Sequence, residues 1–364
     1  MKNSMKKQTQ ITPSSDLLRH MINPLLTWHR ANRRPLPWRK DKNPYRIWLS
    51  EIMLQQTRIE AVIPYYHRFL SELPTVEALA SVSDEKLMKL WEGLGYYSRA
   101  RNLKKAAISV ITEYGGALPR DFGSLRDLAG IGDYTAGAIA SIAYGLPEPA
   151  VDGNVLRVIM RLTGREDDIA LAATKKKVTE ELRAVYPSGE EAGLLTEGLM
   201  ELGEQICLPN GVPKCEDCPW KDFCVANRDG RQQELPQKSP KKSRRSEDYT
   251  VLLLIHNGRL ALRKRPEEGL LRGMWELPSL AGHQSCAEIR SFLEEKGLAP
   301  RSVIAREKAT HIFTHVEWHM IGMIAECDIP SEDYFWFDKE ALEQDVALPT
   351  AFRVYRKLFL TSFS

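Results

Sequence analysis

Residues 128–138 read LAGIGDYTAGA and place a Gly-Ile-Gly tripeptide between two segments whose apolar residues have helical spacing. The two glycines allow the backbone to turn tightly and to approach a ligand closely. The N-terminus of the following helix offers free N–H groups, which suit a phosphate. A helix-hairpin-helix that holds a DNA backbone without reading its sequence needs this pattern, and a plain turn between two helices shows it equally often.

The surroundings of this stretch are helical as well. From about Leu17 to Cys224, apolar residues recur three and four positions apart, and the short breaks contain Gly or Pro. No alternation typical of strands is present. The sequence therefore predicts eight to eleven helices in this region.

Length and composition restrict the class of protein. A chain of 364 residues is long enough for two domains. The 43% hydrophobic and 27% charged residues exclude a disordered chain, a collagen-like fibre and a coiled-coil rod. The net charge of +3, from 51 basic and 48 acidic residues, excludes a strongly basic polyanion binder, although a local basic face is compatible with it.

Targeting signals are not evident. Residues 1–15 are polar and contain lysine, with no apolar segment behind them, and the most hydrophobic run is only Val251–Ile255. We therefore expect a cytoplasmic protein without a membrane partner, in a compartment that keeps cysteines reduced.

The composition changes after the helical region. Residues 227–248 contain almost nothing apolar to bury and are interpreted as a linker, whose basic run at 238–245 either contacts phosphate or is simply solvated. Thr250–Ile255 then resembles a strand, 256–258 a turn and 259–263 its hairpin partner. A helix at 285–295 and strands within 313–326 complete a second, α+β domain over 249–364.

Four of the six cysteines lie within eighteen residues, in the spacing C-x7-C-x2-C-x5-C. In a reducing compartment this favours four thiolates around one structural metal centre. Zinc sites made of four cysteines usually contain two separated C-x2-C pairs. A single pair flanked by two lone cysteines suits a [4Fe–4S] cluster better, and zinc remains the alternative. The ligands would be Cys207, Cys215, Cys218 and Cys224.

Two carboxylates have contrasting surroundings. If its segment is a helix, Glu51 has Ile47 and Trp48 one turn before it and Leu54 one turn after it, and a carboxyl on an apolar face has the raised pKa of a general acid. Asp152 precedes a helix, where N–H donors would keep it ionised. Such a pair is typical of an acid and a stabilising anion. An ordinary surface acid and a plain N-cap are the alternatives.

Together these segments resemble the helix-hairpin-helix DNA glycosylases, and most closely the MutY-type adenine DNA glycosylases. The resemblance covers most of the chain and rests on an ordered set of motifs. These are LPWR at 36–39, SEIMLQQT at 50–57, WEGLGYY at 91–97, GIG at 130–132 and VDGN at 151–154.

The resemblance implies a multidomain protein: an all-α helix-hairpin-helix glycosylase domain over 16–226, with its hairpin at about 125–138, the 227–248 linker, and a Nudix-like domain over 249–364. It implies a monomer that binds double-stranded DNA and hydrolyses the N-glycosidic bond of adenine mispaired with 8-oxoguanine or guanine. Glu51 would protonate the flipped base. Asp152 would stabilise the oxocarbenium-like sugar, Asn154 would help to position it, and Tyr134 would support this chemistry.

Tyr134 also distinguishes between reactions. Relatives that resemble endonuclease III and cut the strand carry a lysine there, because a lyase needs an amine for its Schiff base. Tyr134 therefore predicts a monofunctional glycosylase. The rival interpretations are a pyrimidine glycosylase with lyase activity, a Nudix pyrophosphatase and a non-catalytic DNA-binding protein.

The resemblance also assigns substrate contacts. It implies that the flipped adenine is held by Trp38, Arg39, Leu54 and Glu197, while Gln56 and Tyr96 insert into the duplex. Core packing is the alternative for Trp38 and Leu54.

The cysteine segment matches the [4Fe–4S] loop of the same family over 207–224. The first interval usually holds six residues, whereas here it holds seven, 208–214. Lys214 and Lys221 are the candidates for phosphate contacts in this loop, and the added residue puts those contacts in question.

Residues 269–278, GLLRGMWELP, resemble the start of the Nudix signature, but 279–288 lack the acidic R-E-x-x-E-E arrangement. The second domain is therefore expected not to hydrolyse nucleotides and instead to read 8-oxoguanine. The family's recognition loop is matched by 311–315, HIFTH, where Thr314 replaces a frequent serine. An ordinary packing pair is the alternative for Phe313 and His315. With Gly130 and Gly132 of the hairpin, the implied DNA contacts are Phe313, Thr314 and His315.

Overall fold

The computed structural model describes residues 13–240 and 243–362. The N-terminal stretch up to residue 12 and the lysines 241 and 242 of the basic run lie outside the described residues. The chain divides into two compact units: unit 1 ends at residue 81 and resumes over 102–240, and unit 2 comprises 82–101 and the chain from 241 onward. No helix among the described residues has the length and apolar character needed to cross a membrane.

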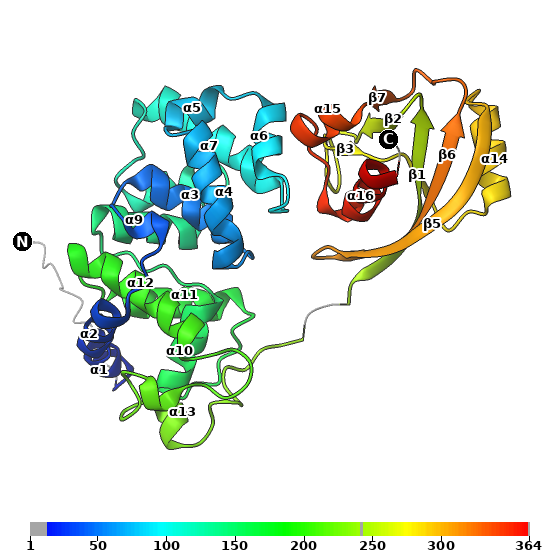
Figure 1. Ribbon diagram of the computed structural model, residues 1–364. Helices are drawn as coiled ribbons and strands as arrows, with labels where there is room; N and C mark the ends of the chain where they lie inside the picture. The colour runs from blue at the N-terminus through cyan, green and yellow to red at the C-terminus, as the bar shows by residue number, and fades with distance from the viewer. Residues whose placement is uncertain (1–12, 241–242, 363–364) are drawn as a thin grey trace, which may run out of the picture. The chain divides into compact units, whose positions relative to one another are not determined.

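Unit 1 contains helices and no strand in its described part (Figure 1). Its helices are α1 (Pro13–His20), α2 (Ile22–Asn32), α3 (Pro44–Leu54), α4 (Ile59–Glu72), α5 (Val76–Ser81), α7 (Ser98–Tyr114), α8 (Phe122–Asp127), α9 (Asp133–Tyr144), α10 (Gly153–Thr163), α11 (Ala172–Arg183), α12 (Glu190–Gln205) and α13 (Val225–Arg228), with 3-10 turns η1 (Pro37–Arg39) and η2 (Cys215–Asp217). α7 begins in unit 2, which also contains α6 (Asp84–Trp91).

The helices of unit 1 form two groups. One hydrophobic core joins α1 and α2 to α10, α11 and α12, although these segments are far apart in the chain. Figure 1 shows this group together with α13, and a second group made of α3, α4, α5, α7 and α9. α9 contacts both α3 and α12, so it links the two groups. The predicted all-helical fold of this unit is confirmed.

Unit 2 is built on a mixed sheet. Its central order is β3-β2-β1-β6-β5, with β4 beside β1 and β7 beside β2, and only β1 and β6 run parallel. The strands are β1 (Arg245–His256), β2 (Arg259–Lys264), β3 (Trp275–Glu276), β4 (Ser279–Ala281), β5 (Pro300–Ile312), β6 (Val316–Cys327) and β7 (Phe335–Phe337), and the helices after α6 are α14 (Cys286–Glu295), α15 (Lys339–Gln344) and α16 (Arg353–Ser362), with the 3-10 turn η3 (Thr350–Phe352).

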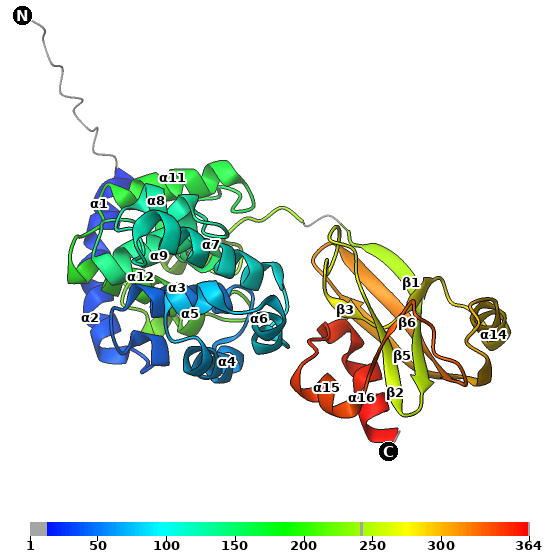
Figure 2. The same cartoon turned by 90° about the horizontal axis from the view of Figure 1, so that it is seen from above.

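Helices cover both faces of this sheet, as Figure 2 shows for α14 and α16. Val251 and Leu253 pack with α15 and α16, whereas Leu252 and Leu254 pack with α14. A strand that is buried on both faces needs apolar residues at every position. This explains why β1 contains the longest apolar run of the sequence.

Some of these elements agree with the sequence predictions, and others correct them. The 250–263 hairpin and the 285–295 helix are confirmed, the latter with Ser285 and Glu288 as a capping box. Twelve α-helices begin within 13–205 instead of eight to eleven, because α5, α6 and α8 have only six to eight residues. Strand β5 was not predicted. Residues 227–240 are not wholly solvated either, since Leu235 is buried and its carbonyl oxygen accepts a hydrogen bond from Arg161 at 2.8 Å.

Candidate active site

Glu51 lies on α3 with only 6% of its surface exposed. α3 begins at a well-formed cap, because Asn43 accepts the N–H of Arg46 and a proline occupies the first turn. Burial raises the pKa of Glu51 to about 7, and the charge of Asp152 acts in the same direction, while a hydrogen bond with the Tyr134 hydroxyl opposes both. The carboxyl can therefore carry a proton at neutral pH.

Asp152 is the N-cap of α10. Its Oδ1 accepts the N–H of Val155 at 2.8 Å, and its Oδ2 accepts the side-chain amide of Asn154 at 3.1 Å. Burial is the largest influence and raises the pKa of Asp152, while the backbone donors of Val155 and Asn154 lower it. The predicted donors are present, but the effect of burial is larger, so the pKa of Asp152 is raised and not lowered.

Asn154 also connects the cap to the cysteine loop. Its side-chain oxygen accepts a hydrogen bond from Arg157 at 2.9 Å, and Arg157 donates to the carbonyl oxygens of Gly203 and Cys207, each at 2.8 Å. Gly203 can have no larger side chain here, because a Cβ atom would lie 2.8 Å from that of Asn154. Sequence reasoning did not single out Arg157, although its place one turn after Asn154 on the same helix was visible.

A pocket brings together Glu51 and the four residues expected to hold the base. Trp38 and Arg39 come from η1, Leu54 from the end of α3 and Glu197 from α12. The pocket does not include Asp152, Asn154 or Tyr134. Its full lining is Arg34, Leu36, Trp38, Arg39, Ile47, Ser50, Glu51, Leu54, Ile59, Ile142, Glu197, Met200, Glu201 and Glu204.

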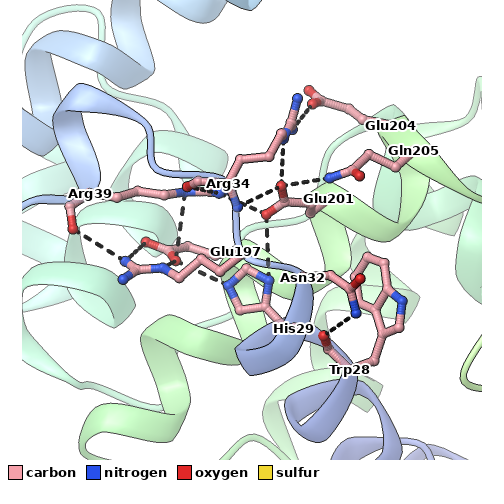
Figure 3. A network of polar contacts seen from close by, with 10 residues as sticks. Trp28, His29, Asn32, Arg34, Arg39, Glu197, Glu201, Glu204 and Gln205 are labelled. Carbon is pink, nitrogen blue, oxygen red and sulfur yellow. Dashed lines mark hydrogen bonds and ion pairs between the residues drawn. The ribbon is translucent and has the colours of Figure 1, made fainter.

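A network of charges forms the α12 wall of this pocket (Figure 3). Glu201 is fully buried and accepts hydrogen bonds from Arg39 at 2.7 Å and from Arg34 at 2.5 Å. Glu197 accepts from Arg33 at 2.8 Å, and hydrogen bonds from His29 and Arg33 hold its pKa near 2 against the effect of burial.

Sequence reasoning selected Glu197 and Arg39 from this network and missed its other charged members, which are His29, Arg33, Arg34, Glu201 and Glu204. Glu197 and Glu201 are four residues apart in an otherwise apolar stretch, which places both on one face of a helix. That spacing was a readable signal for Glu201. No comparable signal existed for His29, which meets its partners only through the packing of α2 against α12.

Gln56 and Tyr96, the residues expected to enter the duplex, both have positive φ, at 58° and 47°. Residues with side chains rarely adopt this conformation, and it concentrates at ligand-binding sites. Gln56 is exposed directly after α3, and Tyr96 is 45% exposed in unit 2.

The hairpin at 128–132 joins α8 to α9, as the sequence predicts. Gly130 has a φ of 77°, and a Cβ atom on it would lie 2.7 Å from the Cβ atom of Asn102. Gly132 is the N-cap of α9, without any side-chain cap, and it is exposed. The first N–H groups of α9 therefore face no capping side chain, which suits an anion.

The four clustered cysteines line a single cavity next to Arg161 and Trp220. Arg161 donates to the Cys207 Sγ at 3.3 Å, and burial raises the pKa of Cys215, Cys218 and Cys224. Four thiols that line one apolar space, with a guanidinium beside them, are the donor types that a thiolate-bound metal centre uses. As arranged among the described residues, however, no three or more His, Cys, Asp or Glu side chains form a group that could hold a metal ion.

The seven-residue interval is exposed in its middle and returns to the cavity at Pro213, which lines it. Residues 209–212 are exposed, while the N–H of Lys214 closes the loop on the carbonyl of Ile206 at 2.9 Å. Of the two lysines considered for phosphate contacts, Lys214 is exposed, and Lys221 is paired with Glu216 at 3.0 Å.

The proposed recognition residues form the tip of the β5–β6 hairpin. The N–H of Phe313 donates to the carbonyl of Val316 at 2.8 Å, and the Phe313 ring packs against His311 and Trp318 with centroids 4.5 and 4.8 Å away. Thr314 and His315 are exposed. Phe313 therefore packs against His311 and Trp318, and not against His315 as the alternative interpretation has it. The Thr314 hydroxyl donates a hydrogen bond to the Tyr96 hydroxyl at 3.3 Å.

Comparisons with known proteins agree with both units. A family model described as the HhH-GPD superfamily of base excision DNA repair proteins matches residues 49–188, and a NUDIX domain model matches 250–358. The chain is 31% identical to the adenine DNA glycosylase of Homo sapiens, over 91% of this chain and 73% of that one. It is also 31% identical to the adenine DNA glycosylase of Buchnera aphidicola, over 85% and 87%.

Solved structures support the helical fold. A thermostable thymine-DNA glycosylase matches with a TM-score of 0.54 and 30% identity, over 60% of this chain and all of that one. A trapped endonuclease III–DNA covalent intermediate matches with a TM-score of 0.51 and 25% identity, over 61% and 99%.

Proposed function

We propose that this chain, which belongs to the adenine DNA glycosylase family, releases adenine that is mispaired with 8-oxoguanine or guanine. As a member of that family it is a DNA repair hydrolase that acts on the glycosidic bond of adenine in DNA. The observation that carries the proposal is the buried carboxyl of Glu51, whose pKa is about 7, in one pocket with the ionised carboxylate of Glu197. Such a pocket can both protonate a base and bind its amino group.

In the proposed reaction, the adenine leaves the stack and enters the pocket, because its glycosidic bond is inaccessible within the duplex. Glu51 donates its proton to a ring nitrogen, so the bonding electrons leave with a neutral base. The ionised Asp152 stabilises the positive sugar, and Asn154 fixes that carboxylate through its hydrogen bond. A water molecule then adds to the sugar carbon and gives up one proton to the Glu51 carboxylate, which restores the protonated acid.

Glu197 is suited to recognise adenine because an ionised carboxylate only accepts hydrogen bonds, and the exocyclic amine of adenine donates them. Trp38 and Leu54 would pack against the base from the η1 and α3 sides, and Arg39 would keep Glu197 and Glu201 in place. If guanine entered the pocket, its carbonyl oxygen, which accepts hydrogen bonds, would face the Glu197 carboxylate, which also only accepts them.

Tyr134 supports a monofunctional reaction. Its hydroxyl hydrogen-bonds to Glu51 and donates to the sulfur of Met200 at 3.5 Å, and burial raises its pKa well above the ordinary value. A neutral phenol cannot form a Schiff base with the sugar. Strand cleavage is therefore not expected to accompany base release.

The DNA contacts remain as the sequence implies. We assign Gln56 and Tyr96 to insertion into the duplex, and Gly130 and Gly132 to the phosphate backbone. The tip residues Phe313, Thr314 and His315 are assigned to the base opposite adenine. The exposure of Thr314 and His315 and the positive φ of Gln56, Tyr96 and Gly130 support this assignment.

The cofactor is proposed to be a [4Fe–4S] cluster held by Cys207, Cys215, Cys218 and Cys224. When bound, the cluster would hold the loop after α12 in place, and it would take no part in base release. The domain limits of 16–226, 227–248 and 249–364, a monomeric state and a cytoplasmic location belong to the same proposal.

The test is base release from matched duplexes. A duplex with adenine opposite 8-oxoguanine, one with A:G, one with A:T and one with an oxidised pyrimidine are incubated with the full chain and then treated with alkali or left untreated. We expect cleavage of the first two, only after alkali. Cleavage of the oxidised pyrimidine alone, without alkali, would reject the proposal in favour of a pyrimidine lyase.

A further inference from the structure

Unit 2 contains a cavity of about 980 Å³, which is large enough for a ligand. Its lining comes mainly from three parts of this unit: residues 93–101, which lead into α7, residues 269–272 between β2 and β3, and the tip of the β5–β6 hairpin. Thr314 and His315, which were assigned above to the base opposite adenine, are among the lining residues. A nucleotide that reaches them therefore shares this cavity with the groups described next.

The wall made by residues 93–101 is fixed to the C-terminal part of unit 2. The Glu92 carboxylate accepts the N–H of Leu348 at 2.9 Å and a guanidinium N–H of Arg356 at 2.8 Å. The Tyr97 hydroxyl donates to the carbonyl of Leu348 at 3.4 Å. These bonds hold the wall in a defined place beside the loop at 269–272.

The charged side chains of the cavity are mostly basic. Its lining contains one carboxylate, that of Glu247, and four arginines: Arg101, Arg245, Arg265 and Arg272. Arg245 pairs with Glu247 at 2.6 Å, and Arg265 pairs with Glu276. In the described part of the chain, neither Arg101 nor Arg272 has a carboxylate within the distance of an ion pair. These two residues therefore give the cavity a positive charge that the protein does not balance by a direct pair.

The two unpaired arginines lie next to each other. A guanidinium N–H of Arg101 donates to the backbone carbonyl of Arg272. Burial lowers the pKa of Arg101, and the charge of Arg272 lowers it further, while Glu267 and Asp84 act more weakly in the opposite direction. Two like charges repel each other, and an anion between them would remove this repulsion. A guanidinium binds the oxygens of a phosphate particularly well.

The backbone of the same loop offers further donors. Gly269, Leu271 and Gly273 have φ values of 79°, 57° and 62°, whereas the two residues between them do not have positive φ. Such an alternation turns successive N–H groups toward one side and forms a concave anion site. The N–H of Gly273 bonds to the carbonyl of Pro266. No hydrogen bond from the N–H groups of 270–272 is found within the described structure, so these groups are available to a ligand.

We propose that Arg101, Arg272 and the N–H groups of 270–272 form a phosphate site, which binds a phosphodiester of the DNA strand that carries the base opposite adenine. The inference rests on the proposed function for the identity of that strand, because Thr314 and His315 connect the cavity with it. A contact of this kind positions the strand and does not read its sequence. A free nucleotide has the same phosphate chemistry and is distinguished by the experiments.

The first experiment measures the affinity of the full chain for a duplex with A opposite 8-oxoguanine at several salt concentrations. Each phosphate that a protein neutralises contributes about 0.9 to the slope of log affinity against log salt. Arg272→Gln should therefore lower this slope by about 0.9 and weaken binding about tenfold at low salt, as expected for lost hydrogen bonds to a charged group.

Arg259→Gln is the matched control. Arg259 is exposed on the same unit and does not line the cavity, so this variant loses the same charge away from the proposed site. It should keep the slope of the unmodified chain. Equal slopes for Arg272→Gln and Arg259→Gln would refute the proposal.

The second experiment locates the phosphate. Single linkages of the duplex are replaced in turn by uncharged methylphosphonates, in either strand. In the unmodified chain we expect about a tenfold loss of affinity at one linkage near 8-oxoguanine, and Arg272→Gln should show no loss at that linkage. The same losses in both proteins at every linkage would overturn the site. A linkage in the adenine strand that alone depends on Arg272 would overturn the choice of strand.

The two arginines are also tested together. If Arg101 and Arg272 bind one phosphate, the loss of affinity in the double variant should be smaller than the product of the losses in Arg101→Gln and Arg272→Gln. Independent, multiplicative losses would count against a shared phosphate. Circular dichroism checks the fold, and if Arg101→Gln does not fold, Arg272→Gln decides alone because its side chain is exposed.

The remaining experiment distinguishes a DNA strand from a free nucleotide. The full chain is titrated with dGMP and with inorganic phosphate, alone and in competition with the duplex. Saturable binding of dGMP that Arg272→Gln abolishes, together with an unchanged salt slope for the duplex, would overturn the assignment to a strand. All these measurements concern binding, so they decide the phosphate site even if the chain releases no adenine and the proposed function fails.

Discussion

Glu51→Gln should stabilise the protein at alkaline pH while it removes the activity. Folded Glu51 has a pKa of about 7 because it is buried, whereas the ordinary value is 4.5. Between these values the folded chain keeps a proton that the unfolded chain has lost, so the free energy of unfolding falls as the pH rises. Glutamine has a similar shape and no ionisation, so the variant escapes this fall.

The magnitude follows from the difference of about 2.5 between the two pKa values. At about 1.4 kcal/mol for each pKa unit, ionised Glu51 costs about 3 kcal/mol at pH well above 7. Between pH 5 and pH 8.5, the free energy of unfolding of Glu51→Gln should therefore rise by about 2.5 kcal/mol relative to that of the unmodified chain, because part of the difference is already present at pH 5.

The assay is urea denaturation of the full chain. Unfolding is monitored by the circular dichroism of the helices, most of which belong to unit 1. The assay is run at several pH values with the cysteines kept reduced. Glu60→Gln, on the exposed side of α4, controls for the loss of one negative charge. In parallel, Glu51→Gln should bind an A:8-oxoguanine duplex and release no base. Identical pH profiles of unfolding for Glu51→Gln and the unmodified chain would refute the burial argument, and full activity would refute Glu51 as the acid.

Three further outcomes are expected. Tyr134→Phe removes the hydrogen bond that lowers the pKa of Glu51. In a rate–pH profile, the alkaline decline of the release rate, which is expected near pH 7 in the unmodified chain, should therefore move to higher pH. A decline that moves to lower pH would contradict this. Gly130→Ala should weaken duplex binding in a titration and cost about 1–3 kcal/mol of stability, since it combines a positive φ with a close approach to Asn102; wild-type affinity would show that the hairpin needs no glycine. Cys218→Ser should lower the iron and sulfide content and the visible absorbance of the purified protein, and unchanged values would exclude Cys218 as a ligand.

The parts of the fold that sequence reasoning found are those encoded by local patterns. The hairpin at Gly130 and Gly132 depends on backbone freedom, and the β1–β2 pair depends on a short apolar run and a turn. Strand β5 escaped because it lies at the sheet edge and pairs only with β6. Its exposed side chains therefore show no apolar alternation, and charges such as those of Arg306 and Lys308 on an edge strand protect it from pairing with other chains.

The site residues also fall into two groups, those that local sequence patterns predict and those that depend on the packing of distant helices. Glu51 could be predicted because apolar residues lie one turn away on its own helix, and burial of that helix then raises the pKa. The donors to Asp152 could be predicted as well, but the burial that outweighs them could not, since it depends on the packing of several helices. His29 belongs to the same class, because an isolated histidine on α2 gives no hint of two carboxylates on α12.

The wall of the base pocket has a consequence for the order in which the protein is made. His29 and Glu197 are 168 residues apart, and Arg39 and Glu201 are 162 apart. While the ribosome extends the chain, the basic side chains of the first forty residues emerge long before their carboxylate partners. Such long-range contacts form late in folding. A nascent chain that has not yet reached residue 190 contains Glu51, Tyr134 and Asp152 but no wall to receive a base, so the capacity to bind adenine arises only with the last long helix of unit 1.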